Sequence, residues 1–319
     1  MDLFDEQRKD MFVSPVVTPL VAVGYKDVNA GSMKKHGIDI ELKYRHTTHS
    51  GLYYEVGAMV GLNENRITNY EDAPYVPEYQ KYADKPYGAR RNGVTLIDNG
   101  YFNTIDEIHG YPTYSSSWAS VYPGLYKFLD YEIDGSINSG DLHVIDGSAY
   151  PPCVYSFNLG LSWKGLSFNV LFYGNQGKWV AYNKAFEKEF LKKDLTLHTA
   201  QLDYWRPDNR DASHCTLSMD DSMYRWAGGG GTEGYAMSLE GHTWRKSDYL
   251  TLKEVYLAYK FDGPKVKKAL GISGLSVTLS GNNLVTFTNL IEGNPQTTSL
   301  QASNYPVMRI VKLGVKLDF

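Results

Sequence analysis

The sequence has 319 residues, enough for one large domain or two ordinary ones, with 32 Lys and Arg against 36 Asp and Glu. A net charge of -4 and the lack of a basic stripe argue against nucleic acid as a partner. Aromatic residues make up 14% of the chain and include 26 Tyr, a composition that favours strands over a helical bundle.

The sequence carries neither the signal of a secreted protein nor that of a helical membrane protein. Residues 1–15 contain no basic start followed by an apolar run, so we expect no secretory signal there. Nowhere does the chain approach the ~18 consecutive apolar residues that a spanning helix needs. Spanning strands alternate apolar and polar residues, however, so a membrane β-barrel remains compatible with this composition.

Alternation of apolar and polar residues predicts antiparallel strands that follow one another in pairs. The predicted strands are 36–46, 51–63, 153–163, 166–175, 249–261, 274–284 and 311–319. Several reach ten residues, longer than the usual five or six and close to the ~9–11 of a tilted bilayer-spanning strand. Aromatic residues that mark strand ends are Tyr53, Trp163, Tyr173, Tyr249, Tyr259 and Tyr305. Such rings suit two membrane interfaces, but a soluble β-sandwich also alternates, so this pattern leaves both architectures open.

Long irregular segments separate the strand pairs, notably residues 64–120 and 176–248. Long loops alternating with short turns are the layout of outer-membrane barrels, and this asymmetry favours a barrel. Short helices are predicted at 184–194 and 264–270, and Gly228–Gly231 suggests a loop tip. Because we find no internal repeat and no dividing linker, we treat residues 1–319 as one unit.

One acidic loop has the spacing of calcium ligands. Its candidate ligands are Asp130, Glu132, Asp134, Ser136, Asn138 and Asp141. Gly135 stands where a calcium loop turns sharply, although Asp141 reaches less far than the usual Glu at the last position. The pattern predicts either a structural Ca²⁺ site or an ordinary Asp- and Asn-rich surface loop.

Other chemistry-bearing residues form no catalytic pattern. The histidines are scattered, no nucleophile elbow or phosphate-binding loop is present, and we expect the protein not to be an enzyme. Cys153 and Cys215 lie far apart and could form one disulfide or remain unpaired. Four tryptophans in the long segments could stack on sugar rings or, as we favour, pack the loops together: Trp179, Trp205, Trp226 and Trp244.

The last strand is apolar on one face. Its apolar residues are Val311, Leu313, Val315, Leu317 and Phe319, and Lys312, Gly314, Lys316 and Asp318 occupy the other parity. In a barrel the first set would face lipid, whereas in a sandwich it would be buried in a core. A terminal Phe by itself is equally compatible with an ordinary C-terminal strand.

Six segments, in order, resemble the C-terminal barrel portion of TonB-dependent transporters of the SusC/RagA group of Bacteroidetes. They read HGIDIELKYR, YPGLYKFLDYEIDGSINSGDLHVIDGSAYPP, YWRPDNRDA, SDYLTLKEVYLAYKF, LSVTLSGNNLVTFTN and YPVMRIVKLGVKLDF. Together they extend the resemblance from about residue 11 to Phe319. The resemblance implies an all-β fold: the C-terminal portion of a 22-stranded antiparallel transmembrane β-barrel with long external loops, lacking the plug domain and the N-terminal strands.

The resemblance also implies a function, a location and partners. It points to TonB-dependent uptake of a glycan or peptide nutrient across the outer membrane, with no cofactor beyond the calcium considered above. Implied partners are a SusD-like surface lipoprotein, TonB acting through the absent plug, outer-membrane lipid, and the barrel-assembly machinery, which would read Val311–Phe319 as its signal. The alternatives are a secreted carbohydrate-binding β-sandwich and a non-functional gene remnant.

Overall fold

A computed structural model describes residues 1–13, 27–114, 121–181, 199–217, 244–262, 268, 271–290, 293–297 and 305–318. Its strands are β1 Asp2–Val13, β2 Val28–Thr47, β3 Tyr53–Asn69, β4 Arg91–Gly93, β5 Leu96–Tyr101, β6 Thr113–Tyr114, β7 Tyr126–Phe128, β8 Ser136–Ile137, β9 His143–Val144, β10 Cys153–Trp163, β11 Leu166–Gln176, β12 Trp179–Ala181, β13 Trp244–Lys246, β14 Tyr249–Asp262, β15 Gly274–Thr288 and β16 Ile310–Asp318. Its helices are α1 Ile105–His109 and the 3-10 turns η1 Glu78–Gln80, η2 Ser139–Asp141 and η3 Thr199–Leu202.

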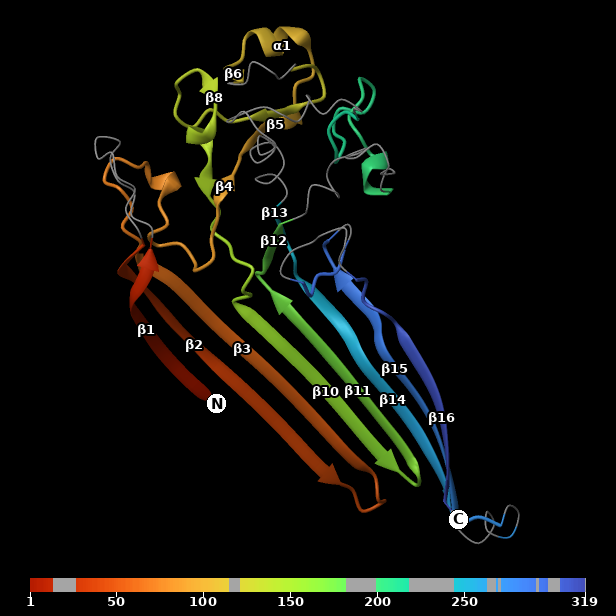
Figure 1. The fold of residues 1–319 in the computed structure, drawn as a ribbon. Coiled ribbons are helices and arrows are strands. Elements are labelled where there is room, and N and C mark those ends of the chain that lie inside the picture. Colours follow the sequence, from red (N-terminus) through yellow and green to blue (C-terminus); the bar gives the residue numbers. More distant parts are fainter. Residues whose placement is uncertain are drawn as a thin grey trace.

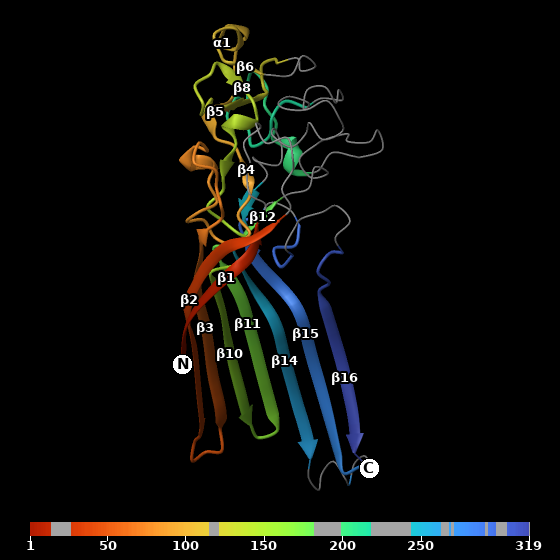
Figure 2. The ribbon, with the colours of Figure 1, turned by 60° about the vertical axis from the view of Figure 1, so that its left-hand side comes forward.

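The main element is one sheet of eight strands in the order β1-β2-β3-β10-β11-β14-β15-β16. All seven pairings within it are antiparallel. It forms a single curved layer in both ribbon views, with β1 and β16 at its edges (Figures 1 and 2). This arrangement confirms the predicted all-β, antiparallel class.

The predicted strands are all present, and some are longer than their alternation suggested. The first predicted pair corresponds to β2 and β3, which have 20 and 17 residues. Strand β1 was not predicted, because Asp5, Glu6, Arg8, Lys9 and Asp10 interrupt any apolar pattern in it. It is held by its backbone ladder to β2, from Asp2 opposite Asp39 to Val13 opposite Val28.

The two ends of the sheet are built differently. Short turns at 48–52 and 164–165 join neighbouring strands at one end. The described residues of the long segments at 70–152 and 177–248 lie at the other end, where Figure 1 shows them above the sheet. The strand pairs therefore have the asymmetry that the sequence predicted. The helices predicted at 184–194 and 264–270 lie outside the described residues apart from Lys268, which is helical.

Candidate functional site

The face that we call the outer face is apolar across the sheet. Direct cross-strand partners form continuous apolar rows: Leu279 lies between Leu257 and Leu313, and Phe157 pairs with Phe172. Members of this face include Ile40, Leu42, Val56, Val60, Leu159, Leu161, Phe168, Val170, Val255, Leu257, Val277, Leu279, Leu313 and Val315. Because no second layer covers the described sheet, many of these side chains are exposed.

A β-bulge preserves the outer face where the strand alternation changes. The register of β14 shifts between Leu252 and Glu254, so Leu252 pairs with Val285 and Phe172 while Val255 pairs with Gly281 and Val170. An extra residue in one strand reverses which parity faces outward beyond it. Leu250 and Leu252 therefore remain on the apolar face although they have the opposite parity from Leu257.

The C-terminal strand distinguishes between a lipid-facing sheet and a sandwich. Leu313 is 75% exposed, and its predicted companions Val311, Val315 and Leu317 are exposed as well. A sandwich would bury this row against a second sheet. Their exposure agrees with the barrel alternative, whereas the fifth predicted residue, Phe319, lies outside the described residues.

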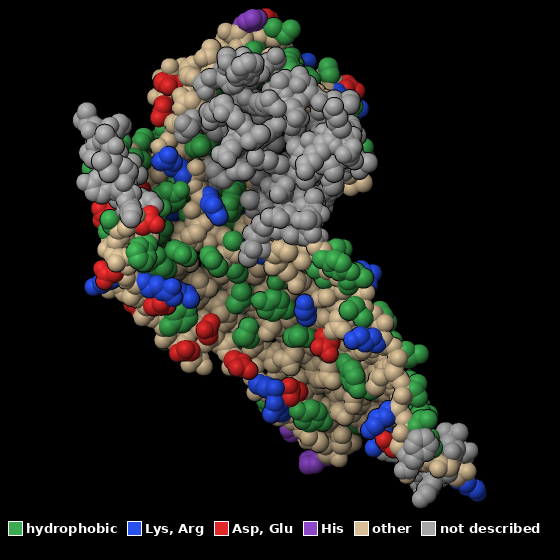
Figure 3. Space-filling view, in the orientation of Figure 1, with side chains coloured by type: hydrophobic (Ala, Val, Ile, Leu, Met, Phe, Trp, Pro, Cys, Tyr) green, Lys and Arg blue, Asp and Glu red, His purple; other side chains and the backbone are tan. Residues whose placement is uncertain are grey.

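The opposite face, which we call the inner face, is polar. Its residues include Lys43, Arg45, Glu55, Asn158, Asn169, Thr278, Ser280 and Lys312. Glu55 accepts from Lys43 at 2.9 Å, from Arg45 at 2.7 Å and from the Tyr53 hydroxyl at 2.9 Å. Figure 3 shows Asp, Glu, Lys and Arg side chains on the sheet, interspersed with hydrophobic and other side chains. The inner face therefore has the chemistry of a water-contacting wall.

The long segments above the sheet pack into one body, which we call the loop assembly (described residues 70–114, 121–152 and 199–217). Its buried core consists of Tyr101, Phe102, Leu125, Tyr126, Phe128, Ile137, Trp205, Ala212 and Cys215. Residues from both segments meet there: the Tyr101 hydroxyl donates to the carbonyl of Ala212 at 2.9 Å. No sequence periodicity marked this core, since its members come from short strands and turns far apart in the chain.

A buried lysine and a half-buried tyrosine lie side by side in the loop assembly. Lys127 donates to Asp98 at 2.6 Å, and its ammonium lies 5.3 Å from the ring centre of Tyr111. The Tyr111 hydroxyl donates to the carbonyl of Phe128. Burial, with a smaller contribution from nearby carboxylates, raises the pKa of Tyr111 to about 12. The phenol is therefore neutral at physiological pH and acts as a hydrogen-bond donor.

Of the tryptophans in the long segments, Trp205 packs in the loop core, as we favoured for this set. Trp205 is 5% exposed and donates to Asn103 at 3.3 Å. Trp179 pairs with Lys246 in the β12–β13 ribbon, and an added Cβ on Gly147 would lie 2.4 Å from its ring. Trp244 begins the other strand of that ribbon. Trp226 and Gly228–Gly231 lie outside the described residues.

The predicted calcium loop is closed by its own hydrogen bonds. Asp141, 2% exposed, accepts from the amides of Tyr131 and Asn138, both at 2.7 Å, and from that of Glu132 at 3.3 Å. Asp130 accepts from the amides of residues 133 and 135, and Asp134 from that of Ser136. Burial, with three neighbouring carboxylates, raises the pKa of Glu132.

Among the described residues, no three His, Cys, Asp or Glu side chains lie close enough together to hold a metal ion. The carboxylates accept from backbone amides rather than converge on one point. Calcium binding by Asp130, Glu132, Asp134, Ser136, Asn138 and Asp141 stays a prediction.

The remaining reactive groups are separate from one another. Cys153 and Cys215 are both free thiols, so of the two alternatives the unpaired one is found. Cys215 is buried in the loop core, while Cys153 is half-buried at the start of β10. In the part of the chain that the structure describes, no helix is long and apolar enough to cross a bilayer.

Comparisons with known proteins agree with this architecture. No protein-family model matches the chain. Along its whole length the chain is 21% identical to a stretch comprising 32% of the TonB-dependent receptor P26 of Formosa agariphila. A structure of the RagAB peptide transporter matches 99% of this chain and 33% of its own, with a TM-score of 0.63 and 21% identity.

A structure of the RagAB peptide importer in the 'closed-closed' state matches with a TM-score of 0.62 and 20% identity, covering 99% of this chain and 33% of that one. The chain thus spans about a third of the length of the proteins that it matches. Similarity to a TonB-dependent receptor in sequence and to the RagAB structures in fold confirms the resemblance to the SusC/RagA group that the six segments indicate.

Proposed function

We propose that this chain forms part of the wall of a TonB-dependent outer-membrane transporter that takes up a glycan or peptide nutrient. One observation carries the proposal: an exposed apolar face continues across the sheet from β2 to β16, with Leu313 75% accessible. Single large exposed hydrophobics are common on soluble proteins, but continuous apolar surfaces mark contact with membrane or protein. In a bilayer these rows would contact acyl chains, and every backbone group of an interior strand would be paired in the ladder.

Each face and each end of the sheet would have its own role in the transporter. The inner face, with Glu55 and Asn158, would line the water-filled passage of a barrel of 22 strands. The short turns would face the periplasm, and the loop assembly would lie outside the cell. The rest of the transporter would supply the plug through which TonB acts, and a SusD-like lipoprotein would close the external mouth. The relatives are a receptor and a transporter, which supports gating rather than catalysis as the mechanism.

The last strand would carry the assembly signal. β16 is an edge strand, and its outer-face residues remain accessible. An exposed edge is a template for strand addition, which is how a barrel-assembly machine would capture Val311–Phe319. Removing Phe319 should lower the yield of membrane-assembled protein, and an unchanged yield would exclude this role.

The exposed outer face argues against the secreted β-sandwich. In a sandwich, Phe157, Leu279 and Leu313 would be covered by a second sheet, and single-layer strands of 14 to 20 residues, such as β14, β15, β3 and β2, would be unusually long.

Lipid exposure of the outer face can be measured directly. We would insert the chain into vesicles whose acyl chains carry a bromine quencher and record tryptophan fluorescence. Trp163 lies at the end of an outer-face row and is 43% exposed, whereas Trp205 is buried in the loop assembly. The proposal expects the quenched signal to disappear in Trp163→Phe and to persist in Trp205→Phe. A chain that remains soluble and monomeric without detergent would contradict membrane placement.

A further inference from the structure

The outer face changes its chemistry abruptly at its loop end. On β1, β2 and β3, three consecutive rows of cross-strand partners are Leu3–Ile38–Leu62, Asp5–His36–Glu64 and Gln7–Lys34–Arg66. Two residues along a strand cover about 7 Å, so the change from apolar to charged takes place over one row. The boundary between acyl chains and headgroups would therefore pass between the first two rows.

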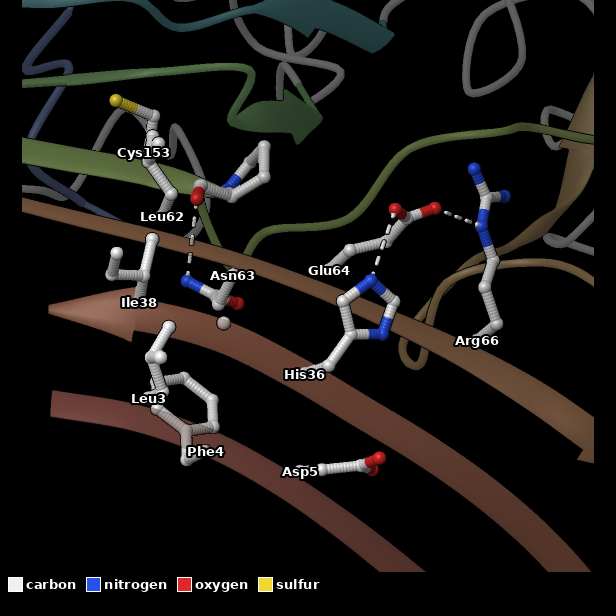
Figure 4. Close-up of a pocket in the computed structure, with 12 residues that line it drawn as sticks. Leu3, Phe4, Asp5, His36, Ile38, Leu62, Asn63, Glu64, Arg66 and Cys153 are labelled. Carbon is white, nitrogen blue, oxygen red and sulfur yellow. Dashed lines mark hydrogen bonds and ion pairs between the residues drawn. The ribbon is translucent and has the colours of Figure 1, made fainter.

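A cavity of about 860 Å³ lies across this boundary. Its apolar end is formed by Leu3, Ile38, Leu62 and Cys153, and its polar end by His36 and Glu64, as Figure 4 shows. This volume is in the range of pockets that hold small organic molecules. A ligand that fills it needs an apolar part and a polar part on the same side of the sheet.

The charged rows are only partly neutralised by one another. Glu64 lies 3.1 Å from Arg66 and 3.6 Å from His36, and Arg66 also pairs with Asp146 at 2.8 Å. Lys34, beside Arg66 in the third row and next to the cavity rather than in its lining, is exposed and makes no ion pair with a described residue. Asp5 lines the cavity and likewise makes no ion pair with a described residue. These contacts hold the Arg66 side chain in place, while the Lys34 ammonium remains available for an anion.

The polar end leads into a second hollow of about 170 Å³, which shares Glu64 and Arg66 with the first. Asp146, Tyr150 and Trp179 also line this hollow. Tyr150 is 58% exposed and stacks on Tyr87 with 6.3 Å between ring centres. Exposed rings beside carboxylates suit a sugar, whose apolar face stacks and whose hydroxyls donate.

We propose that this continuous groove binds a phosphorylated glycolipid of the outer leaflet. Its acyl chains would lie on Leu62 and Ile38, its phosphate would lie beside Lys34 and Arg66, and its sugar would lie against Tyr150. A plain phospholipid headgroup would end at the cations and leave the second hollow unused. The inference rests on the membrane placement proposed above, and it is independent of the transported molecule.

The test is native mass spectrometry of the whole chain released from detergent micelles with an acylated diglucosamine phosphate as probe. We expect one probe per chain. Lys34→Gln should weaken apparent binding about tenfold, the loss of one charge-assisted contact, whereas Lys312→Gln, a matched exposed lysine on the inner face, should change it less than about twofold. Tyr150→Ala should weaken it about fivefold and Tyr75→Ala, another exposed loop tyrosine, should leave it unchanged.

Two competitor probes decide the class of ligand. Phosphatidylglycerol should bind more weakly than the glycolipid and should also lose affinity in Lys34→Gln. It should bind equally to the native chain and to Tyr150→Ala, which also shows that Tyr150→Ala folds. Equal affinity for phosphatidylglycerol and the glycolipid, or equal effects of Lys34→Gln and Lys312→Gln, would overturn the proposal. Binding of glucosamine phosphate without acyl chains at the same strength would overturn it too. A chain soluble without detergent would instead reject membrane placement, so the two failures are distinguishable.

Discussion

The sheet and the loop assembly place their large hydrophobic side chains in opposite ways. Phe102 and Phe128 in the loop assembly are 0% and 1% exposed, whereas Phe157 in the sheet is 41% exposed. The loops thus bury a small core as a water-soluble domain does. The sheet holds together by strand ladders and leaves its apolar side to the surroundings. The loop assembly is therefore suited to water and the sheet to lipid, and a substitution can destabilise either part separately.

The largest effect is expected from opening the loop core. Phe128→Ala should lower the free energy of unfolding of the loop assembly by about 3–5 kcal/mol, because it leaves a cavity in a closed core. The same truncation in the sheet, Phe157→Ala, should cost far less, since lipid or detergent fills the space. Limited proteolysis would follow the loops while the detergent-protected sheet serves as reference. Equal protease sensitivity of Phe128→Ala and Phe157→Ala would contradict the proposed difference between the loop core and the sheet.

A charge on the sheet tests the opposite half of the comparison. Leu279→Lys should reduce folding stability in lipid vesicles by about 2–4 kcal/mol, as for a lysine facing the middle of a bilayer. Thr278→Lys, at the next residue and on the inner face, should be nearly neutral. Folding equilibria in denaturant and vesicles would measure both. A similar cost at 278 and 279 would mean that the two faces meet the same solvent.

Alkaline pH should loosen the loop assembly. Burial raises the pKa of Tyr111 from 10.0 to about 12, so the folded state keeps a proton that the unfolded state releases. Stability from this group is present below pH 10 and declines as pH rises toward 12. Protease protection of the loops between these pH values should fall in the native chain and change less in Tyr111→Phe. An identical pH profile in Tyr111→Phe would exclude this assignment.

The smallest expected effect concerns calcium. If the acidic loop binds Ca²⁺ at millimolar concentration, the loop assembly should gain about 1 kcal/mol of stability. Asp134→Asn should abolish the gain, since Asp134 is an exposed predicted ligand. Asp141 is unsuitable for this test because its carboxylate already accepts from three backbone amides. If calcium left the protease pattern of the native chain unchanged, calcium binding by this loop would be excluded.

Strands were predicted correctly from the sequence where apolar and polar side chains alternate along them. The prediction failed where this alternation is missing. The strand over 153–163 was predicted at the observed bounds of β10, because Phe157, Leu159 and Leu161 must share one face. The first predicted strand, 36–46, was too short, because β2 begins eight residues earlier, at Val28, and includes the charged positions Lys34 and Lys35. There, strand pairing persists through backbone hydrogen bonds that leave no pattern in side-chain type.

The candidate sites were harder to predict than the strands. The outer face could be anticipated from single strands such as Val311–Leu317, because period-two alternation is local. The groove depends on register, since Leu62, Ile38 and Leu3 become neighbours only when three strands align. The loop core is less local still: Phe102 and Trp205 meet across about a hundred residues that show no regular spacing.

The contrast between short turns and long loops has a consequence for the order of folding. Strands β10 and β11 are joined by Lys164 and Gly165, both with positive φ, as a two-residue hairpin turn requires. Closing so short a connection costs little chain entropy and takes microseconds. Pairing β3 with β10 must bring together ends separated by residues 70–152, and such distant contacts form more slowly. We therefore expect hairpins to form first and to be joined into a sheet afterwards, so that errors in assembly concentrate at the β3–β10 and β11–β14 seams.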